Sequence, residues 1–173
     1  MNSTSTTIDN TDLIGSSDGS QQYLTFILDG EEYGVDILRV QEIKGWDRVT
    51  PIPNTPEFIR GVLNLRGTIV PIIDLRLRFN LQHLAYGPTT VVIMLKVLNA
   101  DDKSRIMGIV VDGVSDVYNM PEGDIKPSPD FGAAVDTAFI RGLATVNEKM
   151  VIVLDIDHML NSRELAMLDS VTE

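Results

Sequence analysis

Short apolar runs separated by turn-forming pairs follow one another along most of this chain. Residues 23–28 predict a strand, Asp29-Gly30 a tight hairpin turn, and residues 33–35 the returning strand. The same pattern predicts further extended segments at 42–44, 62–65, 68–73, 89–98, 106–111 and 150–154. Strands this short and this regularly spaced indicate a mainly β fold.

Part of the pattern occurs twice. The tripeptide Ile-Arg-Gly stands at 59–61 and again at 140–142, and each copy precedes an apolar run that ends in Asp, at Asp74 and at Asp155. Both offsets are 81 residues (142 − 61 and 155 − 74). Two copies at this period do not make a solenoid. They predict two similar small β-barrels in one chain, because closing each barrel removes its exposed strand edges.

Helical segments are predicted to be few and short. Asp36 can cap a turn that runs to residue 40, and Thr55-Pro56 predicts a helix over 56–60 that Gly61 ends. Further helical turns are expected at 75–79, from Asp112-Gly113 as the second copy's counterpart of the first turn, and after Ser162 at the C-terminus. Pro71 predicts an edge or a bulge in its strand, since proline cannot donate to a ladder.

Composition and charge narrow the class of protein. Residues 1–20 are rich in Ser, Thr, Asn, Asp and Gly and predict a disordered tail, which leaves 21–173 as one folded unit of two barrels. The net charge of −11 makes nucleic acid and anionic lipid poor partners. No segment has the length of a bilayer span or the pattern of a secretory signal, so we expect a cytoplasmic protein.

The sequence offers little for catalysis. It has no cysteine, and His83 and His158 stand alone, which does not indicate a zinc site. The pair Asp155 and Asp157 lacks the later ligands of a calcium loop. Asp74 and Asp155 are better explained as matching helix caps than as paired catalytic carboxylates. We therefore expect no enzyme activity, no metal and no cofactor.

Several residues have the character of a binding surface instead. Arg66 is predicted at a hairpin tip, where it is either a solvated turn cation or half of a local ion pair, as the residues alone favour, or a contact residue for a partner. Ile37, Leu38, Val40 and Ile43 lie on one short turn and the strand after it, which cannot bury all four. Phe131 follows a proline-bracketed loop and is either an interface anchor or a plug at the end of a barrel.

Seven motifs in order resemble the CheW chemotaxis coupling proteins, close to the enterobacterial type, over about residues 22–170. They are EEYGVDI at 31–37, VQEI at 40–43, NTP at 54–56, IRGV at 59–62, NLRG at 64–67, PIIDL at 71–75 and VVDGVSDV at 110–117. The resemblance implies two packed SH3-like five-stranded barrels and a non-enzymatic adaptor. Its implied partners are the cytoplasmic tips of chemoreceptors and the regulatory domain of the histidine kinase CheA, in arrays beneath the inner membrane.

The resemblance also implies roles for single residues. Receptor binding is expected of Arg66, Val40, Glu42 and Gly61, and more weakly of Val91. Kinase binding is expected of Ile37, and of Lys126 and Phe131 in a second, ring-closing interface. Lys126 stands where close relatives carry Arg, and lysine cannot make the same planar, bidentate pair.

Two other classes of protein are weighed against the adaptor. One is a CheW-like module of a larger signalling protein, either a kinase regulatory domain or a receiver-fused adaptor; a chain of this length has no room for those further domains. The other is an enzyme or a small-ligand barrel, against which the missing nucleophile and metal cluster count.

Overall fold

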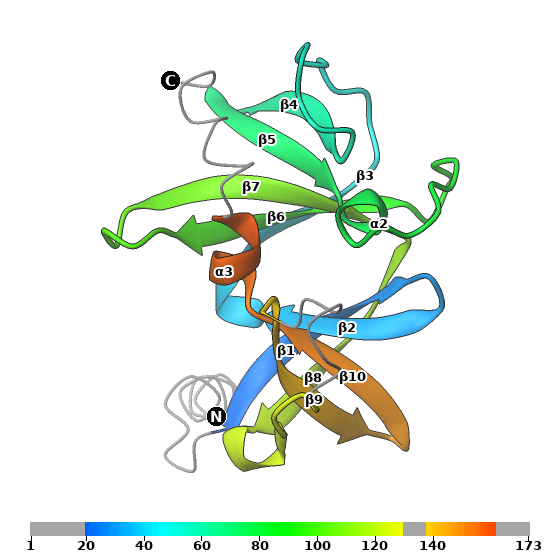
Figure 1. Cartoon of the computed structure of the whole chain (residues 1–173), viewed down its shortest axis with the longest axis vertical. Coiled ribbons are helices and arrows are strands. Elements are labelled where there is room, and N and C mark those ends of the chain that lie inside the picture. The colour runs from blue at the N-terminus through cyan, green and yellow to red at the C-terminus, as the bar shows by residue number, and fades with distance from the viewer. Residues whose placement is uncertain (1–19, 130–137, 162–173) are drawn as a thin grey trace, which may run out of the picture.

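The computed structural model describes residues 20–129 and 138–161, and this part of the chain is mainly β (Figure 1). Its strands form two five-stranded sheets. One sheet has the order β8 (Gly113–Pro121), β1 (Ser20–Leu28), β2 (Glu31–Asp36), β10 (Lys149–Leu154), β9 (Ile140–Val146). The other has the order β3 (Val40–Gly45), β6 (Val91–Leu98), β7 (Ser104–Val111), β5 (Thr68–Asp74), β4 (Ile59–Leu65). The helical elements described are η1 (Ile37–Arg39), α2 (Leu75–Arg78), η2 (Glu122–Asp124) and α3 (Ile156–Leu160).

Each sheet closes into a barrel through one backbone bridge. Thr50, in the segment after edge strand β3, forms an antiparallel bridge to Val62 of the opposite edge strand β4. Lys126, which follows edge strand β8, bridges to Leu143 of β9 in the same way. We call β3–β7 the central barrel and β1, β2 and β8–β10 the terminal barrel. The prediction of two five-stranded barrels is confirmed.

The two copies of the repeat exchange strands between the barrels. The tripeptide copies begin β4 and β9, so β1–β5 and β6–β10 are the repeating units. The terminal barrel nevertheless combines β1 and β2 of the first unit with β8–β10 of the second, and the central barrel takes the remainder. Each barrel is completed by a parallel pairing, of Val153 with Gly34 and of Ile72 with Gly108. The chain therefore crosses between barrels twice, from β2 to β3 and from β7 to β8.

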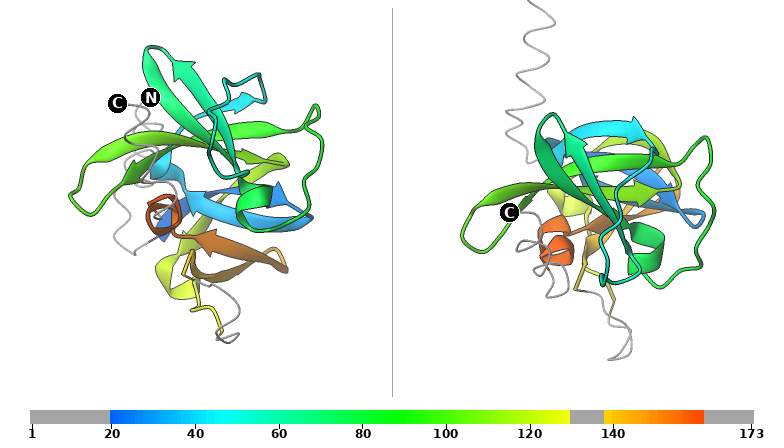
Figure 2. Two further views of the ribbon diagram at one scale, coloured as in Figure 1. Left: turned by 45° about the horizontal axis from the view of Figure 1, so that its top comes forward. Right: turned by 90° about the horizontal axis from the view of Figure 1, so that it is seen from above.

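The main hydrophobic core extends through both barrels. Phe26 and Leu28 of β1 belong to the same buried cluster as Ile93 and Leu95 of β6. Helix α3 contributes further members of this cluster, Ile156, Met159 and Leu160. Figure 1 shows the two barrels one above the other with α2 and α3 at the level between them, and seen from above the barrels overlap (Figure 2). The barrels thus share apolar packing and do not have two separate interiors.

Most of the predicted strands, turns and caps are confirmed. The hairpin tips Asp29-Gly30 and Arg66-Gly67 have the positive φ angles of a tight turn, 54° and 79° in the first and 49° and 91° in the second. Asp36 accepts a hydrogen bond from the Leu38 amide at 2.9 Å and starts the single 3-10 turn η1. The matching caps are found at both repeat positions, where the side chains accept from the amides of residues 77 and 158.

The helix predicted over residues 56–60 is wrong. Only one turn forms there, in which the Ile59 amide donates to the Pro56 carbonyl at 3.0 Å, and β4 begins at Ile59. The Thr55 hydroxyl donates to the carbonyl of Ile52 and does not cap a helix. The ladder with β5 holds this segment extended, and tertiary pairing of this kind overrides a local start signal.

The helical turn predicted from Asp112-Gly113 is also wrong, because β8 begins at Gly113. The Asp112 amide donates to the carbonyl of Ile27 at 3.1 Å, and β8 then pairs with β1. Pro71 lies in a strand interior to its sheet, not at an edge, and the bulge of the β4–β5 ladder lies elsewhere, between Ile59 and Gly61. Parallel pairing with β7 starts only at Ile72, so Pro71 precedes it.

Three predictions fall outside the described residues: the N-terminal tail up to residue 19, the loop position of Phe131, and the helix after Ser162. The helix α3 comes earlier than the predicted one and directly follows the Asp155 cap. Among the helices of residues 20–129 and 138–161, none has the length and hydropathy needed to cross a bilayer.

Candidate partner-binding surface

The tip of the β4–β5 hairpin lies against edge strand β3. Arg66 Nη2 is 2.6 Å from Glu42 Oε1. The turn itself is stabilised by a hydrogen bond within the hairpin, in which the Gly67 amide donates to Asn64 Oδ1 at 2.8 Å. The Arg66 side chain remains 74% exposed, whereas that of Glu42 is 29% exposed. The structure therefore brings together two predicted receptor-binding residues and leaves most of the guanidinium open to solvent.

Exposed apolar side chains lie on the elements that carry this ion pair or on elements next to them in the chain. Leu38 of η1 is 72% exposed and Ile43 of β3 is 41% exposed, which agrees with the prediction that one short turn and its strand cannot bury all four of their apolar residues. Ile69, which follows the hairpin tip, is 42% exposed and was missed by the sequence analysis. The sequence carries no signal for the exposure of Ile69, because it begins an unbroken apolar run to Ile73 and the residues that follow it in β5 are all buried.

Gly61 supports this surface without offering a side chain to it. It is buried in β4 with φ of +143°, and a Cβ placed there would lie 2.2 Å from the carbonyl oxygen of Thr50. The close approach belongs to the bridge that closes the central barrel. A substitution at Gly61 would therefore act on the position of the β4–β5 hairpin and, through it, on Arg66.

The remaining predicted residues of this region are half-buried. Ile37, Val40 and Val91 all pack against the main core cluster. Val40 pairs with Leu95 in the β3–β6 ladder, and Val91 pairs with Gly45 at the other end of it. Each of the three thus presents part of its surface to solvent and part to the core.

The other predicted kinase-binding residues belong to the terminal barrel. Lys126 is exposed, its Nζ donates to the carbonyl of Gly123 at 3.2 Å, and its backbone forms the closing bridge with Leu143. Phe131 lies outside the described residues. The structure thus places Lys126 on a different barrel from Arg66, Glu42 and Val91, and the sequence-predicted set divides between two surfaces.

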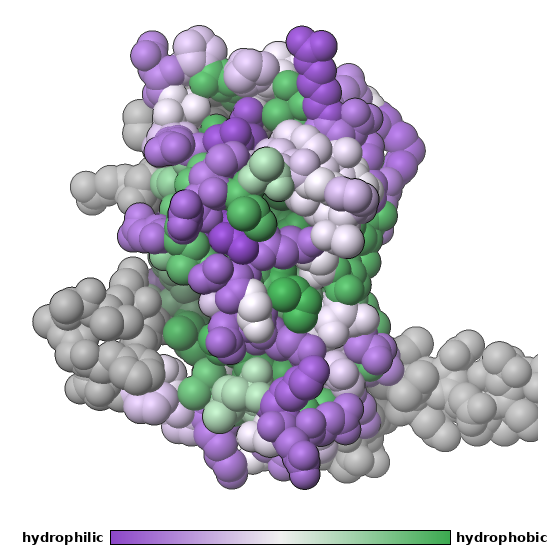
Figure 3. Space-filling model, turned by 90° about the vertical axis from the view of Figure 1, so that its right-hand side faces the viewer, coloured by the Kyte–Doolittle hydropathy of each residue, from purple (hydrophilic) through white to green (hydrophobic). Residues whose placement is uncertain are grey.

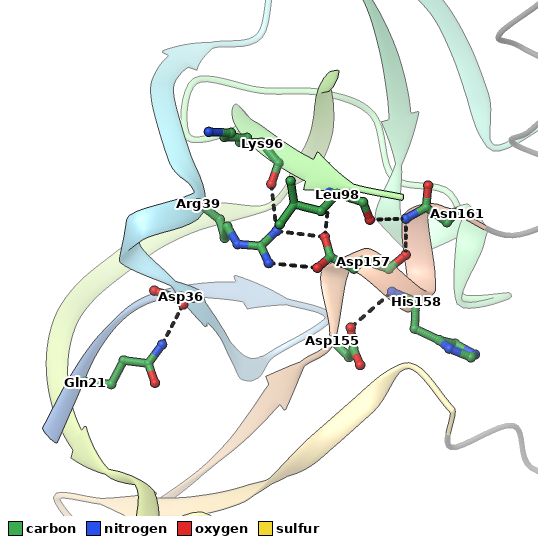
Figure 4. A network of polar contacts seen from close by, with 9 residues as sticks. All are labelled: Gln21, Asp36, Arg39, Lys96, Leu98, Asp155, Asp157, His158 and Asn161. Atoms are coloured by element: carbon green, nitrogen blue, oxygen red, sulfur yellow. Dashed lines mark hydrogen bonds and ion pairs between the residues drawn. The ribbon is translucent and has the colours of Figure 1, made fainter. Parts of the chain in front are cut away.

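A polar network connects the first crossover to α3 (Figure 4). Both amino groups of Arg39 donate to the carboxylate of Asp157, each at 2.7 Å, and Arg39 Nη1 also donates to the carbonyl of Lys96 at 3.1 Å. The Leu98 amide donates to Asp157 Oδ1 at 2.8 Å. Burial would raise the pKa of Asp157, but the hydrogen bonds from Arg39 and Leu98 outweigh it and hold that pKa below its ordinary value.

A second ion pair is present at the other crossover. Arg76 Nε and Nη2 donate to the two carboxylate oxygens of Asp112 at 2.8 and 2.7 Å. The amide of Asp29 donates to Asp112 Oδ2 at 2.9 Å. Burial works against the charged form here too, and the hydrogen bonds from Arg76 and Asp29 more than offset it, so that the pKa of Asp112 is lowered.

Asp74 is the one carboxylate of the described residues that is almost completely buried, at 1% exposure. Tyr86 donates its hydroxyl to Asp74 Oδ2 at 2.5 Å, and His83 Nδ1 lies 3.6 Å from the same oxygen. Burial first, and the hydrogen bond to Asp74 second, raise the pKa of Tyr86 far above its ordinary value. Tyr86 also packs against Trp46, with ring centroids 4.2 Å apart. This cluster fixes the loop between α2 and β6 to the central barrel.

These polar side chains serve structural contacts. In residues 20–129 and 138–161 no group of three or more His, Asp or Glu side chains is arranged to hold a metal ion. Among the described residues on the face seen in Figure 3, hydrophobic side chains form separate patches between polar ones. A surface of this kind suits protein contacts better than the binding of one small molecule.

The fold agrees with known proteins. The family model for the CheW-like domain matches residues 22–164. The chain belongs to the CheW-like family. The chemotaxis protein CheW of Klebsiella aerogenes is 50% identical over 153 residues, which cover 88% of this chain and 89% of that protein. The CheW of Rhizobium meliloti is 34% identical over 148 residues, with 86% and 92% covered.

A solved structure supports the same family assignment. The crystal structure of the scaffolding protein TtCheW from Thermoanaerobacter tengcongensis matches with a TM-score of 0.73 and 34% sequence identity, covering 83% of this chain and 94% of that one. The resemblance to the enterobacterial type is confirmed by the Klebsiella relative. The chain is a non-enzymatic coupling adaptor of chemotaxis, and these relatives give no sign of a module from a larger signalling protein.

Proposed function

We propose that this CheW-like protein couples the cytoplasmic tips of chemoreceptors to the regulatory domain of the histidine kinase CheA. The observation that carries the receptor part is the geometry of Arg66, which is 74% exposed at a hairpin tip while one of its amino groups donates to Glu42. A guanidinium offers five donors in a fixed plane, so the remaining edge suits a carboxylate or carbonyl of a partner.

The surface around Arg66 has the composition of a protein interface. The elements of the central barrel that carry or adjoin Arg66 and Glu42 expose the apolar side chains of Leu38, Ile43 and Ile69, and Val40 and Val91 at the two ends of the β3–β6 ladder are half-buried. An arginine with apolar neighbours is typical of residues that dominate binding energy. This surface is proposed for the receptor, with Gly61 acting through the hairpin that it supports.

The kinase is proposed to contact both barrels. Ile37 lies on η1 beside the receptor surface, whereas Lys126 is exposed on the terminal barrel. Lys126 and Phe131 would contribute to a second, smaller interface, in which a lysine makes a single-point contact where an arginine would make a bidentate one. Repeated use of two interfaces would build arrays at the inner face of the membrane, where receptor tips lie.

Co-sedimentation with receptor cytoplasmic fragments and CheA tests this proposal, with kinase activity as the readout. The protein alone should neither bind nor hydrolyse ATP, and it should stimulate CheA only when receptor fragments are present. Stimulation that does not need the receptor, or sedimentation with neither partner, would contradict the proposal.

A further inference from the structure

The helix residues of the two ion pairs at the chain crossovers stand at equivalent positions of the internal repeat. Asp157 of α3 follows Arg76 of α2 by 81 residues (157 − 76), the same offset as between the two tripeptide copies. Their partners, Arg39 and Asp112, stand at the two corresponding corners, from β2 to β3 and from β7 to β8. The charges are exchanged, since the helix supplies the acid in one pair and the base in the other.

Each pair connects both barrels. Asp157 follows the last strand of the terminal barrel, and its carboxylate accepts from the amide of Leu98 in the central barrel. Arg76 follows β5 of the central barrel, and its partner Asp112 accepts from the amide of Asp29 in the first hairpin of the terminal barrel. Arg76 Nη2 also lies 3.5 Å from Asp29 Oδ1. The helix, the crossover and the hairpin of the opposite barrel therefore meet at each pair.

A third contact lies at the same junction. The guanidinium of Arg78 in α2 is 5.1 Å from the ring centre of Phe58 and 4.5 Å from that of Phe139. The two phenylalanines are themselves 81 residues apart (139 − 58). Phe58 directly precedes β4 of the central barrel, and Phe139 directly precedes β9 of the terminal barrel. Arg78 thus lies between equivalent aromatic rings of the two copies.

The geometry of the two ion pairs differs from that of a surface salt bridge. The side chains of Arg39 and Asp157 are 24% and 32% exposed, and those of Arg76 and Asp112 are 11% and 25% exposed. Both pairs are bidentate, and such forks fix direction as well as distance. Apolar packing, which supplies the shared core, is not directional. A fixed angle between the barrels needs contacts of the directional kind.

We propose that the Arg39–Asp157 and Arg76–Asp112 pairs hold the two barrels in one relative orientation and are positioning residues for coupling. The orientation matters because Arg66 and the proposed receptor surface lie on the central barrel, whereas Lys126 lies on the terminal barrel. Partners that bind both of these surfaces at once require a fixed distance between the surfaces. The orientation itself is independent of the proposed function, and only its consequence for coupling rests on that function.

Distance measurement by pulsed electron spin resonance tests the orientation directly. The chain has no cysteine, so Thr68→Cys and Lys149→Cys place one spin label at the exposed, equivalent start of β5 and of β10. Asp157→Asn and Asp112→Asn remove the charge and keep an acceptor for the neighbouring amide. We expect one narrow distance distribution in the unsubstituted background and a broader, displaced one in each variant, with the largest change in the double variant.

A matched control removes an ion pair inside one barrel. Arg141 of β9 lies 3.5 Å from Glu122 of η2, both in the terminal barrel, so Glu122→Gln should leave the distribution unchanged. If an Asn variant fails to fold by circular dichroism, Arg39→Lys and Arg76→Lys take its place, because lysine keeps the charge and loses the fork. Distributions that stay as narrow and centred as in the control, in whichever set is folded, would overturn the proposal.

The consequence for coupling is measured separately with the full chain. Asp157→Asn should still sediment with receptor fragments alone and with CheA alone, and should lose most of its stimulation of CheA in the three-component mixture. Full stimulation by a variant with a broadened distribution would overturn the positioning role. A protein that couples nothing even without substitution would instead contradict the proposed function, while the distance result would stand.

Discussion

Glu42 lies on edge strand β3 of the central barrel and Arg66 in the turn that follows the opposite edge strand β4, and their side chains meet at 2.6 Å where the barrel closes. The contact depends on closure, because Thr50 must bridge to Val62 before the β4–β5 hairpin can lie beside β3. The direction of the exposed guanidinium is therefore set by the fold of the whole barrel. We therefore expect residues that shape the closure, Gly61 above all, to affect partner binding without touching the partner.

Gly61→Ala should destabilise the protein strongly. An added Cβ would lie 2.2 Å from the Thr50 carbonyl oxygen, and a positive φ alone costs a non-glycine residue roughly 1–3 kcal/mol. Chemical denaturation measures the change in the free energy of unfolding. Gly123→Ala is the matched control, since a Cβ there meets nothing within 4 Å and the residue has no positive φ. Equal stability of both variants would show that the closing bridge is not needed.

Tyr86→Phe should lower the free energy of unfolding by roughly 1–3 kcal/mol, because it leaves one oxygen of the buried Asp74 carboxylate without its hydroxyl donor. Urea unfolding at neutral pH checks this value. Tyr118→Phe removes a hydroxyl from a half-buried tyrosine of β8 and should cost less. If the two variants unfold at the same urea concentration, the Tyr86–Asp74 contact does not stabilise the loop between α2 and β6.

Local chemistry in the sequence was enough to predict the hairpin tips, the Asp caps and the two barrels. The failures have one physical cause, which is that long-range pairing decides between local alternatives. Thr55-Pro56 carries a helix start signal, yet Ile59 pairs with Ile73 and the chain stays extended. Asp112 has the chemistry of a cap and binds Arg76 and the Asp29 amide, both distant in sequence.

The same limit applies to the candidate site. The shortness of one turn predicted only that some of its apolar residues are exposed, without saying that these are Leu38 and Ile43, and the contact between Arg66 and Glu42 depends on barrel closure. The exchange of strands between the two copies of the repeat could not be read from the offset of 81 residues alone. A repeat shows that two units are similar but does not show which strands pair.

Acidification should destabilise the protein through Asp157 and Asp112. Both have a pKa lowered by folding, so their contribution to stability is complete above the unfolded pKa of about 3.9 and is lost as the pH falls through the lower folded pKa. Asp157→Asn should therefore lose less stability than the unsubstituted protein between about pH 5 and pH 2. The measurement is the free energy of unfolding of both proteins across that pH range. An equal loss of stability in both would contradict a stabilising role for the ionised Asp157 carboxylate.

Removal of residues 1–19 should leave folding and coupling nearly unchanged, because that segment contains little apolar surface to bury. The truncation keeps Ser20, which pairs with Pro121 at the start of β1. Thermal melting and CheA stimulation of the truncated protein are the measurements. A fall of several degrees in the melting temperature would show that the segment packs on the barrels.

The central claim is that Arg66 is a contact residue for the receptor, held in place by Glu42. An exposed ion pair contributes only roughly 0–1 kcal/mol to stability, so Arg66→Ala should melt almost normally. Truncation of an interface arginine with a paired acceptor costs roughly 2–5 kcal/mol of binding, so the same variant should bind receptor fragments far more weakly. Arg66→Lys should restore binding only in part, since it keeps the charge and loses the planar fork.

The most direct test is co-sedimentation with receptor cytoplasmic fragments, measured beside thermal melting for the unsubstituted protein, Arg66→Ala and Arg66→Lys. The account predicts equal melting temperatures and a receptor affinity that falls from Arg through Lys to Ala. Normal receptor binding by Arg66→Ala would contradict it and make Arg66 a solvated turn residue. A melting temperature lowered by many degrees in Arg66→Ala would contradict it in another way, by showing that the pair with Glu42 is a structural clamp.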